Sequence, residues 1–159
     1  MNFKSANFGF KQSKQDLSAF EDRFIRYVSA QFGLCERIED LADTLPENVN
    51  LRECLLVSRT VVPLLRRAHR FEEDNIFPAL ILAFDEDDAI RILLDRLRRE
   101  HREDEGYAGE LKEDLARFVS DRENCNIDSL AYMMRGFFRG LRRHVAFERD
   151  FLLPLMATP

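Results

Sequence analysis

The segment His69-Arg-Phe-Glu-Glu-Asp-Asn-Ile-Phe-Pro78 is the part of the sequence that decides which fold is predicted. Within it, His69 and Glu73 are four residues apart, so on a helix they project from one face with a single turn between them. From that arrangement one helix can offer an imidazole nitrogen and a carboxylate oxygen to the same metal ion. The segment therefore predicts a helix that carries metal ligands.

The same spacing of histidine and glutamate occurs at two further places. His101 is followed by Glu105 and His144 by Glu148, and these complete the chain's 3 histidines. The third pair also repeats the surroundings of the first, since it runs into Leu-Leu-Pro as the first runs into Ile-Phe-Pro. Three pairs on three segments predict three helices that bring ligands to a shared site.

Composition favours one domain built of long amphipathic helices. The 159 residues match the usual length of a single domain. Charged residues make up 33% of the chain, whereas glycine and proline number 6 and 5, and many charges with few helix breakers are typical of helix bundles. The net charge of −5 gives no general attraction to nucleic acid, and the paired arginines are interpreted as solvated helix faces, so no nucleic-acid partner is expected.

Cysteine usage and the length of the apolar runs indicate the cellular compartment. Cys35, Cys54 and Cys125 are odd in number and share no CxxC spacing, so they are interpreted as reduced thiols rather than a disulfide framework. No signal peptide is recognisable at the N-terminus, and no apolar run approaches the roughly 20 residues that a membrane span needs. We therefore expect a cytoplasmic protein that does not associate with membranes.

Apolar residues recur at steps of three and four along most of the chain. We expect four helices, over residues 15–45, 51–84, 87–119 and from residue 126 or 128 to 156. Residues 1–14 lack this period but carry three phenylalanines, so they are expected to form an arm that packs on the body. The chain thus divides into an arm, 1–14, and an all-α, up-down-up-down four-helix bundle over 15–159.

Each histidine–glutamate pair replaces apolar residues on the core-facing stripe of its helix. One such pair alone is more often a hydrogen-bonded core histidine with its partner. Three carboxylates in one core, however, would repel one another, and burying each ion costs several kcal/mol unless a cation lies between them. Imidazole and carboxylate ligands suit iron, manganese or zinc, and six of them can hold two ions if carboxylates bridge.

Two further features of the second helix affect the site. Pro63 and Pro78 each lack the amide hydrogen that a helix interior needs, so each is expected to kink or divide the helix. Glu72 stands directly before Glu73 and is expected to face solvent, with rotation into the site as an additional ligand as the alternative.

These residues resemble the hemerythrin-like, HHE-type cation-binding family. The resemblance covers the chain from the first helix onward and rests on three motifs: His69-x3-Glu73 followed by Ile-Phe-Pro, Glu100-His101, and His144-x3-Glu148 followed by Leu-Leu-Pro. It implies a four-helix bundle with a non-haem di-iron centre. Members of the family bind dioxygen or nitric oxide, sense oxygen or iron, or assist the repair of iron–sulfur clusters.

The resemblance also implies roles for individual residues. It assigns six metal ligands by position: His69, Glu73, His101, Glu105, His144 and Glu148. Glu73 and Glu148 match the carboxylates that bridge the two irons, and the histidines before them match terminal ligands. His101 matches the first residue of a third-helix pair whose second member is often a histidine, whereas here that member is Glu105.

The first helix departs from the family pattern because it lacks the histidine that relatives usually carry there. Tyr27, Val28 and Gln31 are the candidates for that position. Neither Val28 nor Gln31 is a strong iron ligand, and Tyr27 could bind only as a phenolate. This loss, together with the extra carboxylate of Glu105, argues against a reversible oxygen carrier.

Three classes of function follow from the sequence. The favoured one is a non-enzymatic, cytoplasmic di-iron protein that binds or senses oxygen, nitric oxide, iron or redox state, with a protein partner possible. The second is a di-iron enzyme, such as an oxidase that consumes peroxide or oxygen, or a cluster-repair factor. The third is a partner-binding regulatory module with a degenerate metal site.

Overall fold

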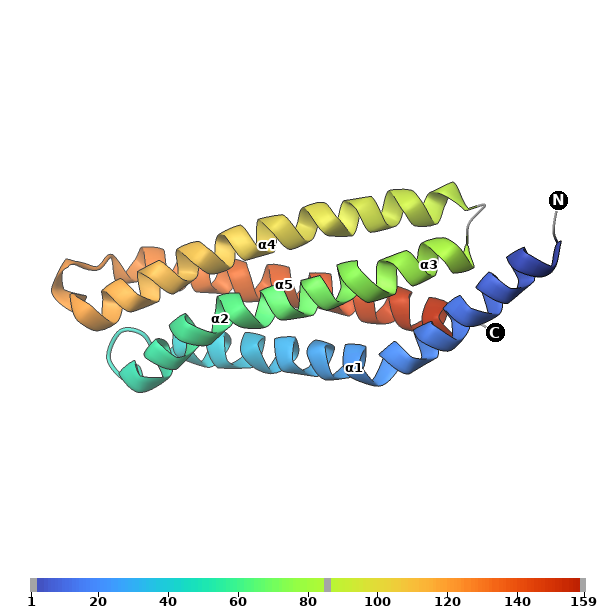
Figure 1. Ribbon diagram of the computed structural model, residues 1–159. Coiled ribbons are helices and arrows are strands. Elements are labelled where there is room, and N and C mark those ends of the chain that lie inside the picture. The colour runs from blue at the N-terminus through green and yellow to red at the C-terminus, as the bar shows by residue number, and fades with distance from the viewer. Residues whose placement is uncertain (1–2, 85–86, 158–159) are drawn as a thin grey trace.

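Four helical rods run side by side in the computed structural model, which describes residues 3–84 and 87–157, with side chains described from Leu17 onward (Figure 1). The elements in chain order are α1 (Phe3–Thr44), α2 (Leu51–Phe71), the π-helix η1 (Glu72–Ile76), α3 (Phe77–Ala83), α4 (Asp88–Ser120), the short 3-10 helix η2 (Arg122–Asn124) and α5 (Ile127–Ala157). Helices α1 and α5 pack against each other, as do α2 and α4. The predicted antiparallel four-helix bundle is confirmed.

Apolar residues at steps of three and four fill the interior of the bundle. Phe24 of α1, Leu65 of α2, Leu97 of α4 and Leu141 of α5 are each at most 1% exposed. Complete burial of such a side chain contributes about 1.5–3 kcal/mol. Each of the four helices therefore contributes one apolar stripe to the core, and a few buried polar residues interrupt these stripes.

Short polar side chains start three of the helices. The side-chain oxygen of Asn50 accepts a hydrogen bond from the backbone N–H of Glu53 at the start of α2. Asp87 does the same for Ala89 in α4. At α5 the capping oxygen belongs to Asn126, which accepts from Ser129. Of the two predicted starts for the fourth helix, the structure therefore favours the earlier.

The first helix begins at Phe3 rather than near Gln15, so the expectation that residues 3–14 lack helical structure is wrong. This segment contains no proline, and Gly9 alone does not terminate a helix whose other residues tolerate it. Residues 1–2 and the side chains up to Asp16 lie outside the described set. Packing of the arm on the bundle therefore stays a prediction.

The two prolines of the helical segment from Leu51 to Ala83 have different effects. Helix α2 continues as an α-helix through Pro63, so that residue does not divide it. The division lies at η1, directly before Pro78 in the first turn of α3. A proline cannot donate to the carbonyl four residues earlier and crowds it, and a wider π turn in front of Pro78 accommodates both effects.

In the part of the chain that the structure describes, no helix combines the length and the apolar character needed to cross a membrane. The cysteines Cys35, Cys54 and Cys125 are free thiols, as the sequence predicts.

Candidate metal site

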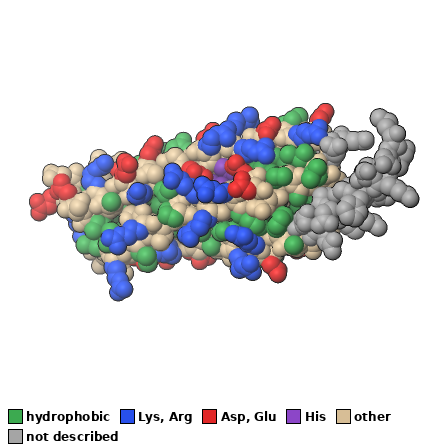
Figure 2. All heavy atoms as spheres, viewed as in Figure 1, with side chains coloured by type: hydrophobic (Ala, Val, Ile, Leu, Met, Phe, Trp, Pro, Cys, Tyr) green, Lys and Arg blue, Asp and Glu red, His purple; other side chains and the backbone are tan. Residues whose placement is uncertain are grey.

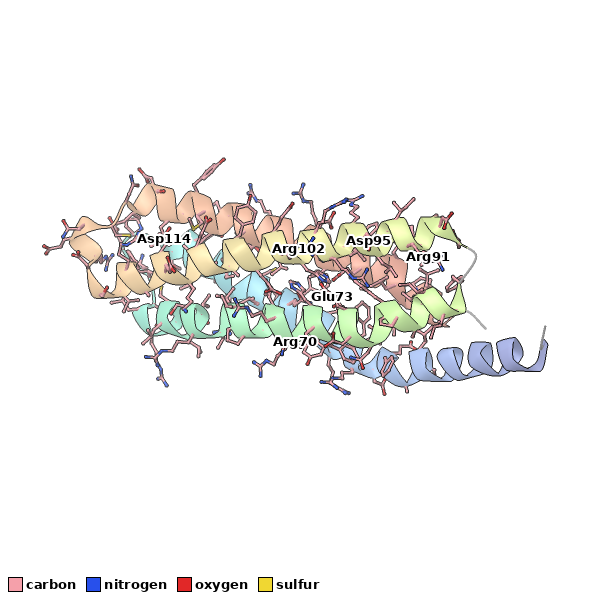
Figure 3. All side chains as sticks on the ribbon, turned by 45° about the horizontal axis from the view of Figure 1, so that its top comes forward. Arg70, Glu73, Arg91, Asp95, Arg102 and Asp114 are labelled. Atoms are coloured by element: carbon pink, nitrogen blue, oxygen red, sulfur yellow. The ribbon has the colours of Figure 1, made fainter. Side chains whose placement is uncertain are left out.

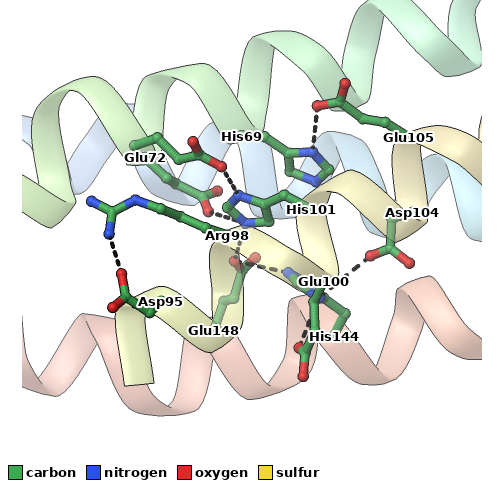
Figure 4. Close-up of polar contacts among 11 residues, drawn as sticks. His69, Glu72, Asp95, Arg98, Glu100, His101, Asp104, Glu105, His144 and Glu148 are labelled. Carbon is green, nitrogen blue, oxygen red and sulfur yellow. Dashed lines mark hydrogen bonds and ion pairs between the residues drawn. The ribbon is translucent and has the colours of Figure 1, made fainter. Parts of the chain in front are cut away.

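Three histidines from three helices meet in the interior of the bundle (Figure 4). His69 of α2, His101 of α4 and His144 of α5 are 2%, 1% and 7% exposed. The rings of His69 and His101 stack with their centroids 4.0 Å apart, and the centroid of His144 lies 5.3 Å from that of His101. The expectation that the three pairs converge at one level is confirmed for the histidines.

Two fully buried carboxylates lie on the inner side of this histidine group. Glu148 Oε1 is 2.9 Å from Nε2 of His101 and 2.9 Å from Nε2 of His144, so one oxygen faces both rings. Glu72 Oε2 is 3.3 Å from the same nitrogen of His101. His101 is therefore in contact with two carboxylates that are 0% exposed.

Glu73 and Glu105 lie at the rim of the site and pair across helices. Glu73 Oε1 is 2.7 Å from Nδ1 of His101, and Glu105 Oε1 is 3.0 Å from Nδ1 of His69. Each glutamate thus contacts the histidine of the opposite pair. Their side chains are 32% and 27% exposed, and Figure 3 shows Glu73 between α2 and α4. In this arrangement they fix the orientation of two rings, and direct metal ligation by either stays a prediction.

The expectation that Glu72 faces solvent is wrong. The buried stripe of α2 passes through Val61, Leu65 and Ala68 and reaches Glu72 at a step of four. Glu72 is also three residues after His69, and residues three apart share a helix face as residues four apart do. This continuation of the stripe is the sequence signal that identifies Glu72.

The π turn begins at Glu72 itself. Its five residues end where the backbone N–H of Phe77 reaches back to the carbonyl of Glu72. Single π turns inside longer helices occur frequently at functional sites. Here the turn separates a buried Glu72 from a half-exposed Glu73, although the two are adjacent in sequence.

Two acidic residues of α4 were not identified from the sequence as part of the site. Glu100 Oε2 is 3.2 Å and Asp104 Oδ2 is 3.4 Å from Nδ1 of His144. Burial raises the pKa of Asp104 above its usual range. Asp104 could have been identified from the sequence, because it is three residues after His101 and residues three apart share a helix face.

Burial and neighbouring charges separate the pKa values of the histidines. Burial, followed by the charge of His101, lowers the pKa of His69 to about 3, so its imidazole is neutral. Burial also opposes the charged form of His101, but its hydrogen bonds to Glu148 and Glu72 outweigh burial and raise its pKa to about 11. A neutral imidazole has a lone pair ready for a metal, whereas His101 must first lose a proton.

The two buried glutamates also differ in protonation. Burial, followed by the charge of Glu148, raises the pKa of Glu72 well above its usual range. Burial opposes ionisation of Glu148 as well, but His144 and His101 together lower its pKa below the usual range. In the metal-free protein the site thus contains a charged Glu148 paired with imidazolium and a neutral Glu72.

Several buried atoms of the site make no hydrogen bond. They include Oε1 of Glu72, Oε2 of Glu148 and Nε2 of His69. A buried polar group without a partner costs about 1–3 kcal/mol. Oxygen and nitrogen atoms of this kind, gathered in one place, fit a cation as the missing partner.

The distances among these groups meet the requirement for a shared ion. Among the described residues, two sets place one ligand atom each within 4.8 Å of one another: His69–His101–His144 and Glu72–His101–Glu148. Every member of both sets is buried, and both sets contain His101. The residues present can therefore hold a metal ion through imidazole and carboxylate ligands.

Helix α1 carries Tyr27, Val28 and Gln31, the candidates for the position of the missing histidine. The ring of Tyr27 packs on Phe71, with centroids 5.5 Å apart, and Val28 is part of the apolar core. Gln31 is fully buried, and neither its amide oxygen nor its amide nitrogen makes a hydrogen bond. Ligation by Tyr27 or Gln31 stays a prediction, and Gln31 is the one that brings unpartnered atoms.

The site is buried but not far from the surface. On the face that Figure 2 shows, one imidazole is visible in the middle of the molecule among acidic and basic side chains.

Comparison with known proteins agrees with this geometry. The sequence model of the family described as Hemerythrin HHE cation binding domain matches residues 29–156, which include every residue of both clusters. Searches of curated proteins and of solved structures gave no match. The matched segment covers most of the sequence and carries the histidines and glutamates of the site, and on this basis the chain belongs to the hemerythrin HHE cation-binding domain family.

Proposed function

We propose that this chain binds iron in a non-haem centre and uses it to respond to a small diatomic molecule or an oxidant. The observation that carries the proposal is the position of His101 between two buried carboxylates, Glu72 and Glu148, whose remaining oxygens have no hydrogen-bond partner. These carboxylates, with His69 and His144, would hold the metal. Bound iron would supply a centre that changes oxidation state or takes a ligand.

The donor set is compatible with iron and contains no sulfur. All donor atoms are imidazole nitrogens and carboxylate oxygens, which suit iron, manganese and zinc. Cys35 is buried in α1, and burial raises its pKa to about 12, so it is a thiol rather than a thiolate ligand. An iron–sulfur cluster or a cysteine-ligated structural zinc is not supported by these residues.

Two ions are proposed because two overlapping ligand sets exist. Glu148 Oε1 faces His101 and His144 at equal distances, which suits a carboxylate shared between neighbouring metals. His101 belongs to both ligand sets, so its loss should weaken metal binding by both.

The same residues favour a responding protein over a reversible oxygen carrier. Glu72 adds a buried carboxylate to the site, and anionic ligands stabilise the ferric state. The side of the site that faces α1 brings the neutral amide of Gln31 and no histidine. A centre of this kind is expected to change state on exposure to oxygen or nitric oxide rather than to bind and release oxygen unchanged.

Measurement of metal content tests the proposal, with Glu72→Gln compared against Glu73→Gln. The two positions are adjacent and undergo the same chemical change, but one is buried at His101 Nε2 and the other lies at the rim. We expect up to two irons per wild-type chain, at least about 100-fold weaker binding in E72Q and about tenfold weaker binding in E73Q. One zinc, no metal, or equal effects of the two changes would contradict the assignment.

The response itself is tested by spectroscopy of the iron-loaded protein. Addition of oxygen or nitric oxide should give a spectral change that saturates in proportion to the iron present. Sustained turnover of peroxide or oxygen would instead favour the enzyme interpretation.

A further inference from the structure

A groove of about 880 Å³ lies between α4 and α5 and reaches the edge of the candidate metal site. Its lining includes His144, Glu100 and Asp104, and both carboxylates contact the imidazole of His144 in the site. The groove is thus continuous with the metal-binding residues on one side of the bundle.

Two glycines keep this groove open. Gly136 and Gly140 stand four residues apart on α5, so they lie one turn apart on the same face, and both line the groove. A Cβ atom added at either position would meet no atom within 4 Å. The groove therefore occupies space that side chains at these two positions would fill.

The lining of the groove has an excess of negative charge. Four carboxylates face it, from Glu100, Glu103, Asp104 and Glu110, against two arginines. One of the arginines, Arg96, is 2.6 Å from a carboxylate oxygen of Glu100 and offsets that charge alone. A cleft with such an excess raises the local concentration of cations.

The imidazole of His144 lies between the groove and the interior. Its Nδ1 is within 3.4 Å of Glu100 and Asp104, while its Nε2 is 2.9 Å from the buried Glu148. The side chain is only 5% exposed. Only the ring of His144 would then separate a cation at Glu100 and Asp104 from the buried Glu148.

The opposite approach, between α2 and α4, is closed by paired side chains. Glu105 is held by His69 at 3.0 Å and by Arg66 at 3.4 Å. Glu73 is held by His101 at 2.7 Å. A cation entering there would have to break contacts of 2.7 and 3.0 Å to the histidines, whereas Glu100 and Asp104 in the groove contact His144 at the longer distances of 3.2 and 3.4 Å.

We infer that the groove between α4 and α5 is the route by which a divalent cation enters and leaves the buried site, with Glu100 and Asp104 as the carboxylates that it meets on the way. The inference rests on the proposed metal-binding function. A route differs from a ligand in one measurable respect. Narrowing it slows entry and exit by the same factor, so the equilibrium affinity does not change.

The first test fills the groove with side chains, using the double variant Gly136→Leu and Gly140→Leu. Binding of Co²⁺ to the metal-free protein is followed by stopped-flow absorbance, and release is followed after addition of a chelator. Both rates should fall about tenfold or more, with the dissociation constant unchanged. Gly33→Leu is the matched control, because Gly33 of α1 also has no neighbour within 4 Å of an added Cβ and does not line the groove.

The second test removes charge from the groove without changing its width. Glu103→Gln with Glu110→Gln should lower the entry rate about threefold at low salt, and the difference should disappear at high salt. Glu113→Gln is the control, since Glu113 is exposed on the same helix and does not line the groove.

The outcomes separate the two proposals. Unchanged rates in the leucine double variant, or slowing equal to that of Gly33→Leu, would overturn the entry route while metal binding stands. Loss of affinity in the double variant with an unchanged entry rate would also overturn it, because the glycines would then support the ligands. If wild-type protein takes up no Co²⁺, both the route and the metal-binding function fail.

Discussion

The two walls of the metal site contain different kinds of side chain, although both belong to the same core. The α2–α4 wall, which includes η1, supplies His69, Glu72 and His101, with further carboxylates at its rim. The wall formed by α1 supplies apolar side chains such as Phe24 and, among its described residues, one buried polar residue, Gln31. A cation would therefore be held from α2, η1, α4 and α5.

This difference shows which sequence changes the bundle can tolerate. Helix α1 contributes packing, and any apolar side chain of suitable volume can fill its inner positions. The α2–α4 wall contributes charges that must balance one another, since removal of one member of a buried ion pair costs about 3–5 kcal/mol. We expect changes on that wall to have much larger effects than changes on α1.

The largest effect is expected from His101→Ala, which removes the residue common to both ligand sets. Glu72 and Glu148 would lose the imidazole that both of them contact. We expect metal affinity to fall at least about 100-fold, beyond what loss of a hydrogen-bond partner of a ligand causes. Metal content per chain and isothermal titration calorimetry measure this loss.

Arg102→Ala is the matched control for His101→Ala, because Arg102 is the next residue and is exposed on the outside of α4. It should leave the metal content at the wild-type level. Equal metal content in the two variants would mean that the α2–α4 wall does not hold the ion.

The bundle and the convergence of its histidines could be predicted from the sequence because they depend on local periodicity. Spacings of three and four place His69, His101 and His144 on core-facing stripes, and four such stripes with short connections leave few alternatives. The caps at Asp87 and Asn126 are equally local. Local signals of this kind do not depend on the axial register between neighbouring helices.

The partners of the individual carboxylates could not be predicted in the same way. A spacing of four pairs each glutamate with the histidine of its own helix, and this is what His144 and Glu148 do. Glu73 and Glu105 instead contact histidines on opposite helices, an arrangement set by the register between α2 and α4. Register between helices depends on packing along their whole length, which no single motif contains.

A smaller effect than that of His101→Ala is expected from pH. The pKa of His101 is raised to about 11, so in the metal-free protein its ring holds a proton at neutral pH that a metal ion must displace. Apparent affinity should therefore rise with pH, by about tenfold per pH unit for each proton displaced. His69, with a pKa lowered to about 3, is already neutral and adds no such dependence.

Calorimetry in two buffers of different ionisation enthalpy measures the released protons directly. We expect at least one proton released per chain on metal binding near neutral pH. Binding without proton release would show that the ion displaces no proton from His101 or Glu72, and therefore that the α2–α4 wall does not hold it.

The smallest effect is expected on the α1 wall, from Gln31→Leu. Both amide atoms of Gln31 are buried without a hydrogen bond, and such a group costs about 1–3 kcal/mol. Leucine is similar in volume and brings no polar atom, so the metal-free protein should become more stable by about 1 kcal/mol in urea unfolding. If Gln31→Leu instead weakens metal binding as strongly as Glu72→Gln does, α1 supplies a ligand and the difference between the walls disappears. A gain in stability with unchanged metal content would show that α1 serves as the packing wall of a site whose ligands come from the other three helices.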